Sequence, residues 1–134
     1  MQIVPRKTSI KGSESMFTGH VYLDEVVRGE EPSRVRVAFV HFTPGSRSAW
    51  HSHAVGQTFY IMEGLAVTQA RGGEIIAARA GEAIYTPAGE WHWHGAARDR
   101  FMTHLAIWEA PGDGAESEWG DHVTDEEYDR QPPA

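Results

Sequence analysis

Short runs rich in β-branched and aromatic residues recur along almost the whole chain, and most of them stop at a glycine or a proline. Residues 34–42, RVRVAFVHF, are typical, because the turn signal TPG follows them directly. Such runs predict strands, and many short strands separated by turns predict an all-β fold, an antiparallel β-sandwich or barrel. The other predicted strands cover residues 17–27, 58–64, 65–70, 74–82, 83–90 and 101–112, with a turn expected near Gly64.

Only one clear helix signal is present, and it lies close to the C-terminus. In the run TDEEY, Thr124 can act as the N-cap and Glu127 as its capping-box partner, with acidic residues in the first turn. The run therefore predicts a short C-terminal helix. The chain of 134 residues fits one domain, residues 1–134, whose core needs no disulfide. Residues 1–15 and 129–134 are expected to be peripheral.

The amino-acid composition excludes several kinds of function. Without cysteine there is no thiol nucleophile and no thiolate ligand, so any metal must be held by imidazole, carboxylate or amide groups. The 19 acidic and 12 basic residues give a net charge of -7 with no basic stripe, which argues against a nucleic-acid partner. No apolar run approaches the roughly 18 residues of a membrane span. The first residues also lack the apolar core of a signal peptide, so we expect no membrane partner and a cytoplasmic location.

Two pairs of histidines stand out among the eight in the chain: His51 with His53, and His92 with His94. Side chains two residues apart in a strand share a face, with Cα atoms roughly 6–7 Å apart, and can chelate one ion. Gln57 can join the first pair only if the chain turns at the AVG that precedes it. Several buried imidazoles without a shared purpose would leave polar nitrogens unsatisfied, so the two pairs predict a metal site. The isolated histidines, interpreted as ordinary core or surface residues, are His20, His41 and His122.

The spacing around these pairs resembles the two signature motifs of the cupin superfamily, and the likeness implies a cupin barrel, or jelly roll. The first motif, G-x5-H-x-H-x3-E-x6-G, keeps every spacing here but has Gln in place of Glu. The second, G-x5-P-x-G-x2-H-x3-N, ends in Ala in place of Asn. The motif positions, which together span residues 45–96, are Gly45, His51, His53, Gln57, Gly64, Gly81, Pro87, Gly89, His92 and Ala96.

A resemblance to one group within this superfamily rests on four runs of the sequence: PGSRSAWHSHAVGQT, PAGEWHWHGAA, MTHLAI and HVTDEEY. They resemble the small bacterial cupins that act as manganese-dependent hydroxynitrile lyases. The resemblance implies a divalent metal, Mn(II), with Fe(II), Zn(II) or Ni(II) as alternatives, and cupin barrels of this size commonly form a homodimer or homotetramer. By the same likeness the metal ligands would be His51, His53, Gln57 and His92, and the catalytic residues would be His94 and His104.

This ligand set suits Lewis-acid chemistry on a small-molecule substrate. Three imidazoles and an amide donate no charge, so a divalent ion keeps its positive charge and favours loss of a hydroxyl proton. His94 could take that proton, and His104 could hydrogen-bond to a departing cyanide or protonate it. Trp108, Met102 and Ala106 share the parity of His104 along one predicted strand, which makes them candidate walls of the substrate pocket.

Two other functions stay open. The second candidate is a cupin dioxygenase that uses Fe(II) or Mn(II), or an isomerase. Oxygenases typically use two histidines and a carboxylate, and Gln57 supplies no such charge. The third candidate is a cupin that holds a metal and only binds or senses a small ligand, although such a protein would have less use for uncoordinated histidines. Assays for cyanide release and oxygen uptake discriminate among the three.

Overall fold

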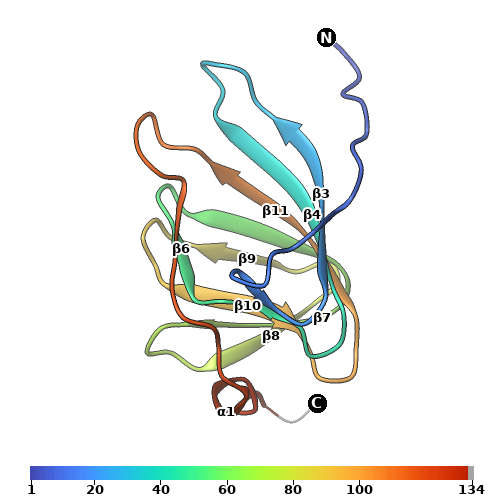
Figure 1. Ribbon diagram of the computed structural model, residues 1–134, viewed down its shortest axis with the longest axis vertical. Helices are drawn as coiled ribbons and strands as arrows, with labels where there is room; N and C mark the ends of the chain where they lie inside the picture. The colour runs from blue at the N-terminus through green and yellow to red at the C-terminus, as the bar shows by residue number, and fades with distance from the viewer. Residues whose placement is uncertain (133–134) are drawn as a thin grey trace.

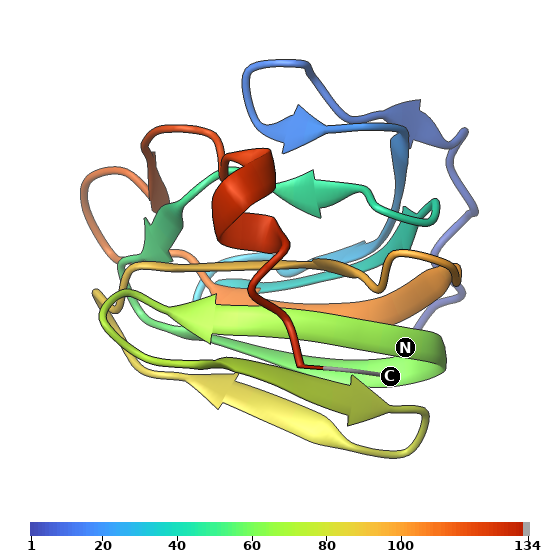
Figure 2. The same ribbon diagram turned by 90° about the horizontal axis from the view of Figure 1, so that it is seen from below.

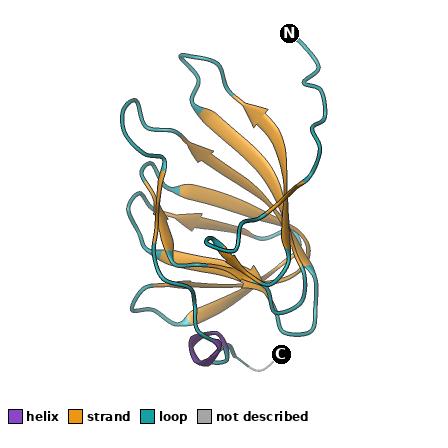
Figure 3. Ribbon diagram, viewed as in Figure 1, coloured by secondary structure: helices purple, strands orange, loops and turns teal. Residues whose placement is uncertain are grey.

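The computed structural model describes residues 1–132 and consists almost entirely of antiparallel strands (Figures 1 and 3). The all-β prediction and the short C-terminal helix are confirmed. Residues 133 and 134, at the end predicted to be peripheral, lie outside the described residues. No helix in the described range is long and apolar enough to cross a membrane. The elements are β1 (Ile10–Lys11), β2 (Phe17–Thr18), β3 (Val21–Arg28), β4 (Val35–Phe42), β5 (Arg47–Ser48), β6 (His51–His53), β7 (Gln57–Ala70), β8 (Ile75–Arg79), β9 (Ala83–Thr86), β10 (His92–Ala96), β11 (Met102–Glu109), β12 (Ser117–Trp119) and α1 (Asp125–Tyr128).

The strands form two curled sheets that share β7, as the view in Figure 2 shows. One sheet has the order β1-β3-β4-β11-β7, and β9 pairs with the start of β7. The other has the order β7-β10-β5-β2, while β8 pairs with the end of β7. The short strand β6 pairs with β10, and β12 pairs with β6. The curled sheets enclose an interior into which alternate side chains project.

Apolar side chains fill much of that interior. Along β4, Ala38, Val40 and Phe42 are buried, and the residues between them are only partly covered, which is the alternation expected of a strand with one core face. Met102 and Ala106 continue the same core from β11. The remaining buried members of this cluster are Phe17, Val21, Phe59, Ile61, Ala66, Ala78 and Ala96.

The strand β7 differs from the sequence prediction, because no turn occurs at Gly64. Instead, one strand of 14 residues runs from Gln57 to Ala70. Residues before Gly64 pair with β9 and β11, and residues after it pair with β8 and β10. Gly64 has a φ of 82°, and a Cβ atom there would lie 1.8 Å from the carbonyl oxygen of Phe101. The glycine therefore marks a bend where β7 passes from one sheet to the other.

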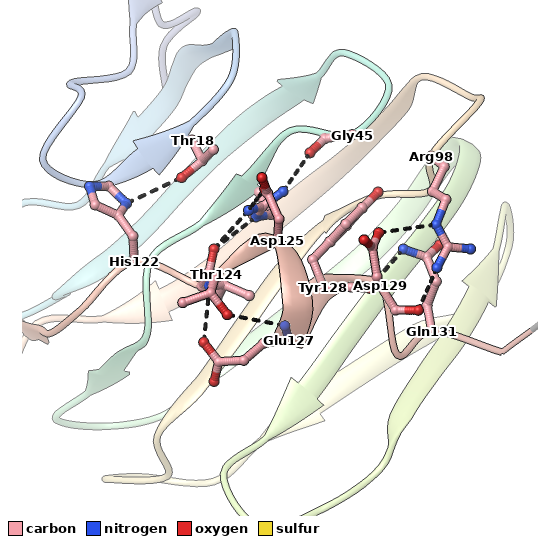
Figure 4. A network of polar contacts seen from close by, with 12 residues as sticks. Thr18, Gly45, Arg98, His122, Thr124, Asp125, Glu127, Tyr128, Asp129 and Gln131 are labelled. Carbon is pink, nitrogen blue, oxygen red and sulfur yellow. Dashed lines mark hydrogen bonds and ion pairs between the residues drawn. The ribbon is translucent and has the colours of Figure 1, made fainter.

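The helix α1 is anchored to the second sheet by polar contacts, several of which Figure 4 draws. Thr124 and Glu127 form the capping box that the sequence predicts. The Tyr128 hydroxyl donates a hydrogen bond of 2.6 Å to the carbonyl oxygen of Ala96 at the end of β10. The buried guanidinium of Arg47 donates to a carboxylate oxygen of Asp125 at 2.7 Å. These contacts hold the C-terminal segment against β5 and against β10, the strand that carries His92 and His94.

Candidate metal centre

Three short stretches of backbone bring the predicted ligands together. His51 and His53 lie at the two ends of β6, and His92 begins β10 directly opposite His51. After His53 the chain reverses, since the amide of Gly56 donates to the His53 carbonyl oxygen at 3.2 Å. Gln57 then starts β7 beside the pair, as the predicted AVG turn requires. All four side chains are buried.

The three imidazoles of His51, His53 and His92 each present one nitrogen to a common point, and these atoms lie within 4.8 Å of one another. The other ring nitrogen, Nδ1, is anchored in each case. His51 Nδ1 lies 2.8 Å from the carbonyl oxygen of Ala49, and His92 Nδ1 lies 2.9 Å from that of Glu90. A carbonyl oxygen only accepts, so Nδ1 carries the proton in both rings and Nε2 keeps its lone pair.

Three of the unpaired buried atoms of the site match the needs of a cation. His53 Nε2, His92 Nε2 and Gln57 Oε1 are buried and have no hydrogen-bond partner among the described residues. Buried polar atoms in proteins almost always have a partner, so these unpartnered lone pairs, two of them on histidines of the same cluster, need an explanation. Imidazole nitrogens and an amide oxygen are donors that divalent cations accept. The residues present therefore fit a divalent metal.

Burial keeps these imidazoles neutral, which is the form that ligates metals. Desolvation, followed by the neighbouring His92, lowers the pKa of His53 to about 4. Desolvation also lowers the pKa of His92, and it holds the pKa of His51 well below its ordinary value. A proton would be more costly in this interior than in water, because the charged form loses its hydration. At neutral pH the three rings are free to donate their lone pairs.

A second pair of imidazoles lies directly behind the first cluster. His94 Nε2 is 3.3 Å from His51 Nε2, and His94 Nδ1 is 3.0 Å from His104 Nε2. Desolvation is the largest cause that lowers the pKa of both rings, to about 3 for His104. Both rings are neutral at pH 7, so His94 has a lone pair to accept a proton.

A small cavity of about 140 Å³ opens onto these histidines. Ala106 and Trp108 line it, whereas Met102 is fully buried in the apolar core and is not among the lining residues. The Trp108 indole donates a hydrogen bond of 2.9 Å to Glu116. The polar part of the wall consists of Gln57, Ser117, His51, His53, His94 and His104. The other lining residues are Met16, Phe17, Leu23, Ala38, Val40 and Trp119.

The isolated histidines lie apart from this site. His41 Nε2 is 2.8 Å from a carboxylate oxygen of Asp24, and its Nδ1 is 3.0 Å from the hydroxyl of Thr103. His122 Nδ1 is 3.3 Å from the hydroxyl of Thr18 (Figure 4). None of the three isolated histidines lines the cavity. Their interpretation as ordinary residues agrees with these contacts.

The strand β12 was not predicted, and it contributes two side chains to the site. Ser117 pairs with His53 and Trp119 pairs with His51 across the β6–β12 ladder. The Trp119 ring stacks on His51 with ring centroids 4.3 Å apart. The segment between β11 and α1 is rich in glycine and acidic residues, and a run of three strand residues in it gives no periodicity to detect.

Known proteins resemble this chain in sequence and in structure. The family model described as Cupin domain matches residues 38–108. The (R)-mandelonitrile lyase of Granulicella tundricola is 42% identical over 127 residues, which cover 95% of this chain and 96% of that protein. A cupin-like protein from Thermotoga maritima superposes with a TM-score of 0.86 at 34% identity, over 98% of both chains. A predicted oxalate decarboxylase from the same organism has a TM-score of 0.66 at 24% identity, over 75% of this chain and 90% of that one, and shows the fold alone.

Proposed function

Because this chain belongs to the cupin family, we propose that its histidine site binds a divalent metal and cleaves or forms cyanohydrins, as a hydroxynitrile lyase does. The likeness to a mandelonitrile lyase over nearly the whole chain supports the reaction class. The observation that carries the proposal is the position of His94. Its imidazole is neutral and lies outside the cluster of three histidines, yet its Nε2 reaches within 3.3 Å of one proposed ligand nitrogen.

His51, His53, His92 and Gln57 would hold the metal, since the three imidazole nitrogens lie within 4.8 Å of one another and the buried Oε1 of Gln57 has no partner among the described residues. A bound divalent cation, which we propose to be Mn(II), supplies Lewis acidity that makes a nearby hydroxyl group more acidic. The ligand set itself carries no negative charge. For that reason we favour proton chemistry over oxygen activation, in which a carboxylate ligand is usual.

In the proposed reaction His94 is the general base. The cyanohydrin hydroxyl gives its proton to His94 Nε2, and the oxygen becomes a carbonyl oxygen while the carbon–cyanide bond breaks. The bonding electron pair leaves on cyanide, which then takes the proton back from His94. Cyanohydrin synthesis is the reverse of these steps. The net reaction converts one cyanohydrin into one carbonyl compound and one hydrogen cyanide, and atoms and charge balance.

His104 supports His94 in this scheme. When Nε2 of His94 has the lone pair, Nδ1 carries the hydrogen and donates it to His104 Nε2 across 3.0 Å. The lone pair of His104 Nε2 then stabilises the positive charge of the imidazolium that forms on His94. From the sequence we expected His104 to meet the cyanide. Its contact with the far nitrogen of His94 favours a role through that ring instead.

The wall of the cavity favours a substrate with an apolar substituent. Leu23, Val40, Ala106 and Trp108 line it, and the polar groups converge at the histidines. A small neutral cyanohydrin with an aromatic or branched group satisfies both parts of this surface.

The test is cyanide release from mandelonitrile by protein stripped of metal and then loaded with Mn(II) or Fe(II). We expect turnover with Mn(II) and none in the metal-free control. Oxygen consumption is recorded in parallel with candidate diols and diketones. Absence of cyanide release with every metal would overturn the proposed lyase function. Sustained oxygen uptake would favour the dioxygenase hypothesis instead.

A further inference from the structure

The third ligand histidine differs from the other two in what anchors its ring. His51 and His92 are held at Nδ1 by backbone carbonyl oxygens, which are fixed by the strands that carry them. His53 Nδ1 instead lies 2.9 Å from the side-chain hydroxyl of Ser117. Its orientation therefore depends on a side chain 64 residues away in the sequence.

The strand that carries Ser117 lies against β6 along its full length. Ser117, Glu118 and Trp119 face His53, Ser52 and His51 in an antiparallel ladder, and the C-terminal segment runs beside β6 in Figures 1 and 2. The Ala54 amide donates to the Glu116 carbonyl oxygen at 2.9 Å, and the Trp50 amide donates to the Asp121 carbonyl oxygen at 2.9 Å. Backbone bonds on both sides thus fix the position of Ser117 relative to His53.

Side chains on both sides of Ser117 also engage the site. The Glu116 carboxylate accepts from the Trp108 indole at 2.9 Å and lies 3.5 Å from the guanidinium of Arg36. Trp119 stacks on His51. The contacts of Glu116 and Trp119 lie on either side of Ser117 and hold this part of β12 in place. The Ser117 hydroxyl therefore has a fixed position next to the His53 ring.

We propose that Ser117 is a positioning residue of the metal centre, which orients the His53 ring so that Nε2 faces the other ligands. The hydroxyl accepts the Nδ1 hydrogen of His53, which leaves the lone pair on Nε2 for the metal. This inference rests on the metal role proposed above for His53, and it does not require the lyase activity. It makes β12, which lies far along the chain from the histidine motifs, a functional part of the site.

The matched test compares Ser117→Thr with Ser117→Val. The two side chains have nearly the same shape and both suit a strand, but only threonine keeps the hydroxyl. The dissociation constant for Mn(II) is measured by competition with a chelator. We expect threonine to bind within about threefold of the unsubstituted protein and valine to bind about 10–100-fold more weakly, the range seen when partners of ligating histidines are removed.

A second readout needs neither metal nor activity. The ¹⁵N chemical shifts of the histidine rings in metal-free protein report which nitrogen carries hydrogen. Ser117→Val should change the shifts of His53 and leave those of His51 and His92 in place, since carbonyl oxygens hold the latter two. Glu118→Val serves as the control for an added branched residue, because Glu118 lies on the same strand with its side chain exposed.

Equal Mn(II) affinity of the threonine and valine variants, with unchanged His53 shifts, would overturn the inference. A weaker valine variant in a protein that releases no cyanide would overturn the proposed lyase and leave the role of Ser117 supported. An unsubstituted protein that binds no metal would overturn the proposed metal centre. The ring shifts would then decide separately whether Ser117 orients His53.

Discussion

Gln57 is the residue that most affects the chemistry available to this site. It is buried beside three neutral imidazoles, and its Oε1 has no partner among the described residues. A carboxylate at this position would bring a negative charge into an interior that already disfavours charge. The amide instead leaves the positive charge of a bound cation uncompensated by the protein.

Exchange of this amide for a carboxylate tests the argument. We expect Gln57→Glu to tighten Mn(II) binding by about tenfold, because a charged ligand attracts the cation more strongly. Cyanohydrin cleavage should fall by about tenfold, since the carboxylate partly neutralises the ion and weakens its Lewis acidity. Chelator competition and cyanide release measure the two effects. Faster cleavage in the glutamate variant would contradict the account.

A substitution of His94 tests whether the general base is distinct from the metal ligands. We expect His94→Ala to keep its bound metal but to lose turnover by about 10²–10⁴-fold, because the change removes a base and not a ligand. Metal content is measured by elemental analysis, and turnover by cyanide release. His20→Ala is the control, because His20 is exposed and does not line the cavity. If His94→Ala lost its metal, His94 would be a ligand and the general base would have to be another group.

Among the elements, β7 shows how one strand joins the two sheets. Its first half carries Gln57 to the site and its second half pairs with β10, which carries His92. The bend at Gly64 sets the angle between these halves. The turn predicted near Gly64 was wrong, because a local turn signal does not distinguish a chain reversal from a bend: pairing with β11 ends at Gly64, and β7 continues beyond it in pairs with β8 and β10.

The bend makes Gly64 sensitive to any side chain. We expect Gly64→Ala to lower the free energy of unfolding by about 1–3 kcal/mol more than Gly45→Ala, the range for an overpacked site. Both glycines have positive φ, at 82° and 80°, so both alanines have the left-handed strain. Only at Gly64 would the Cβ meet the backbone of Phe101, whereas nothing lies within 4 Å at Gly45. Urea unfolding measures the difference, and equal losses at the two glycines would show that the contact with Phe101 relaxes freely.

At the scale of the whole molecule, the buried histidines make the metal-free protein sensitive to acid. Burial lowers the pKa of His104 to about 3 from its ordinary value of 6.5. Between these values the unfolded chain binds a proton at this position that the folded chain does not, so stability is complete above about pH 6.5 and decreases as the pH falls.

For one such histidine, the free energy of unfolding decreases by about 1.4 kcal/mol for each pH unit below the pKa of the unfolded state, down to the pKa of the folded state. His104→Gln removes the titrating ring, and its amide oxygen can still accept from His94. We expect the unfolding free energy of the metal-free variant to fall less steeply between pH 6 and pH 4 than that of the unsubstituted protein. Denaturant unfolding across this range measures both slopes. Identical slopes would mean that His104 takes up a proton in the folded state.

The outer face of the sheet that contains β11, β7 and β9 is apolar and exposed. Ile107 and Tyr85 lie on either side of Thr58, and Tyr60 follows on the same face with 41% of its surface exposed. Exposed apolar side chains that lie together on one face of a protein are candidates for a protein–protein interface. We propose that this face pairs with a second copy of the chain, as the expected homodimer or as half of a homotetramer.

Light scattering during size-exclusion chromatography tests the assembly. The unsubstituted protein should have the mass of a dimer or tetramer, and the double variant Tyr60→Lys with Ile107→Lys should have a lower mass, because two charges cannot be buried unpaired. Ile76→Lys, on exposed β8 away from this face, is the control. A monomeric mass for the unsubstituted protein would contradict the proposal.

The fold class, the family and the grouping of His51 with His53 follow from the sequence alone, because alternation and fixed spacing are local properties of the chain. Three features were decided only by tertiary structure: the register that sets His92 opposite His51, the contact of His94 with His104, and the hydroxyl of Ser117 on His53. Each of these features joins segments that are far apart in the sequence, so no short-range pattern connects them. Which strands pair, and which side chains meet inside, depends on how the whole sheet curls around its core.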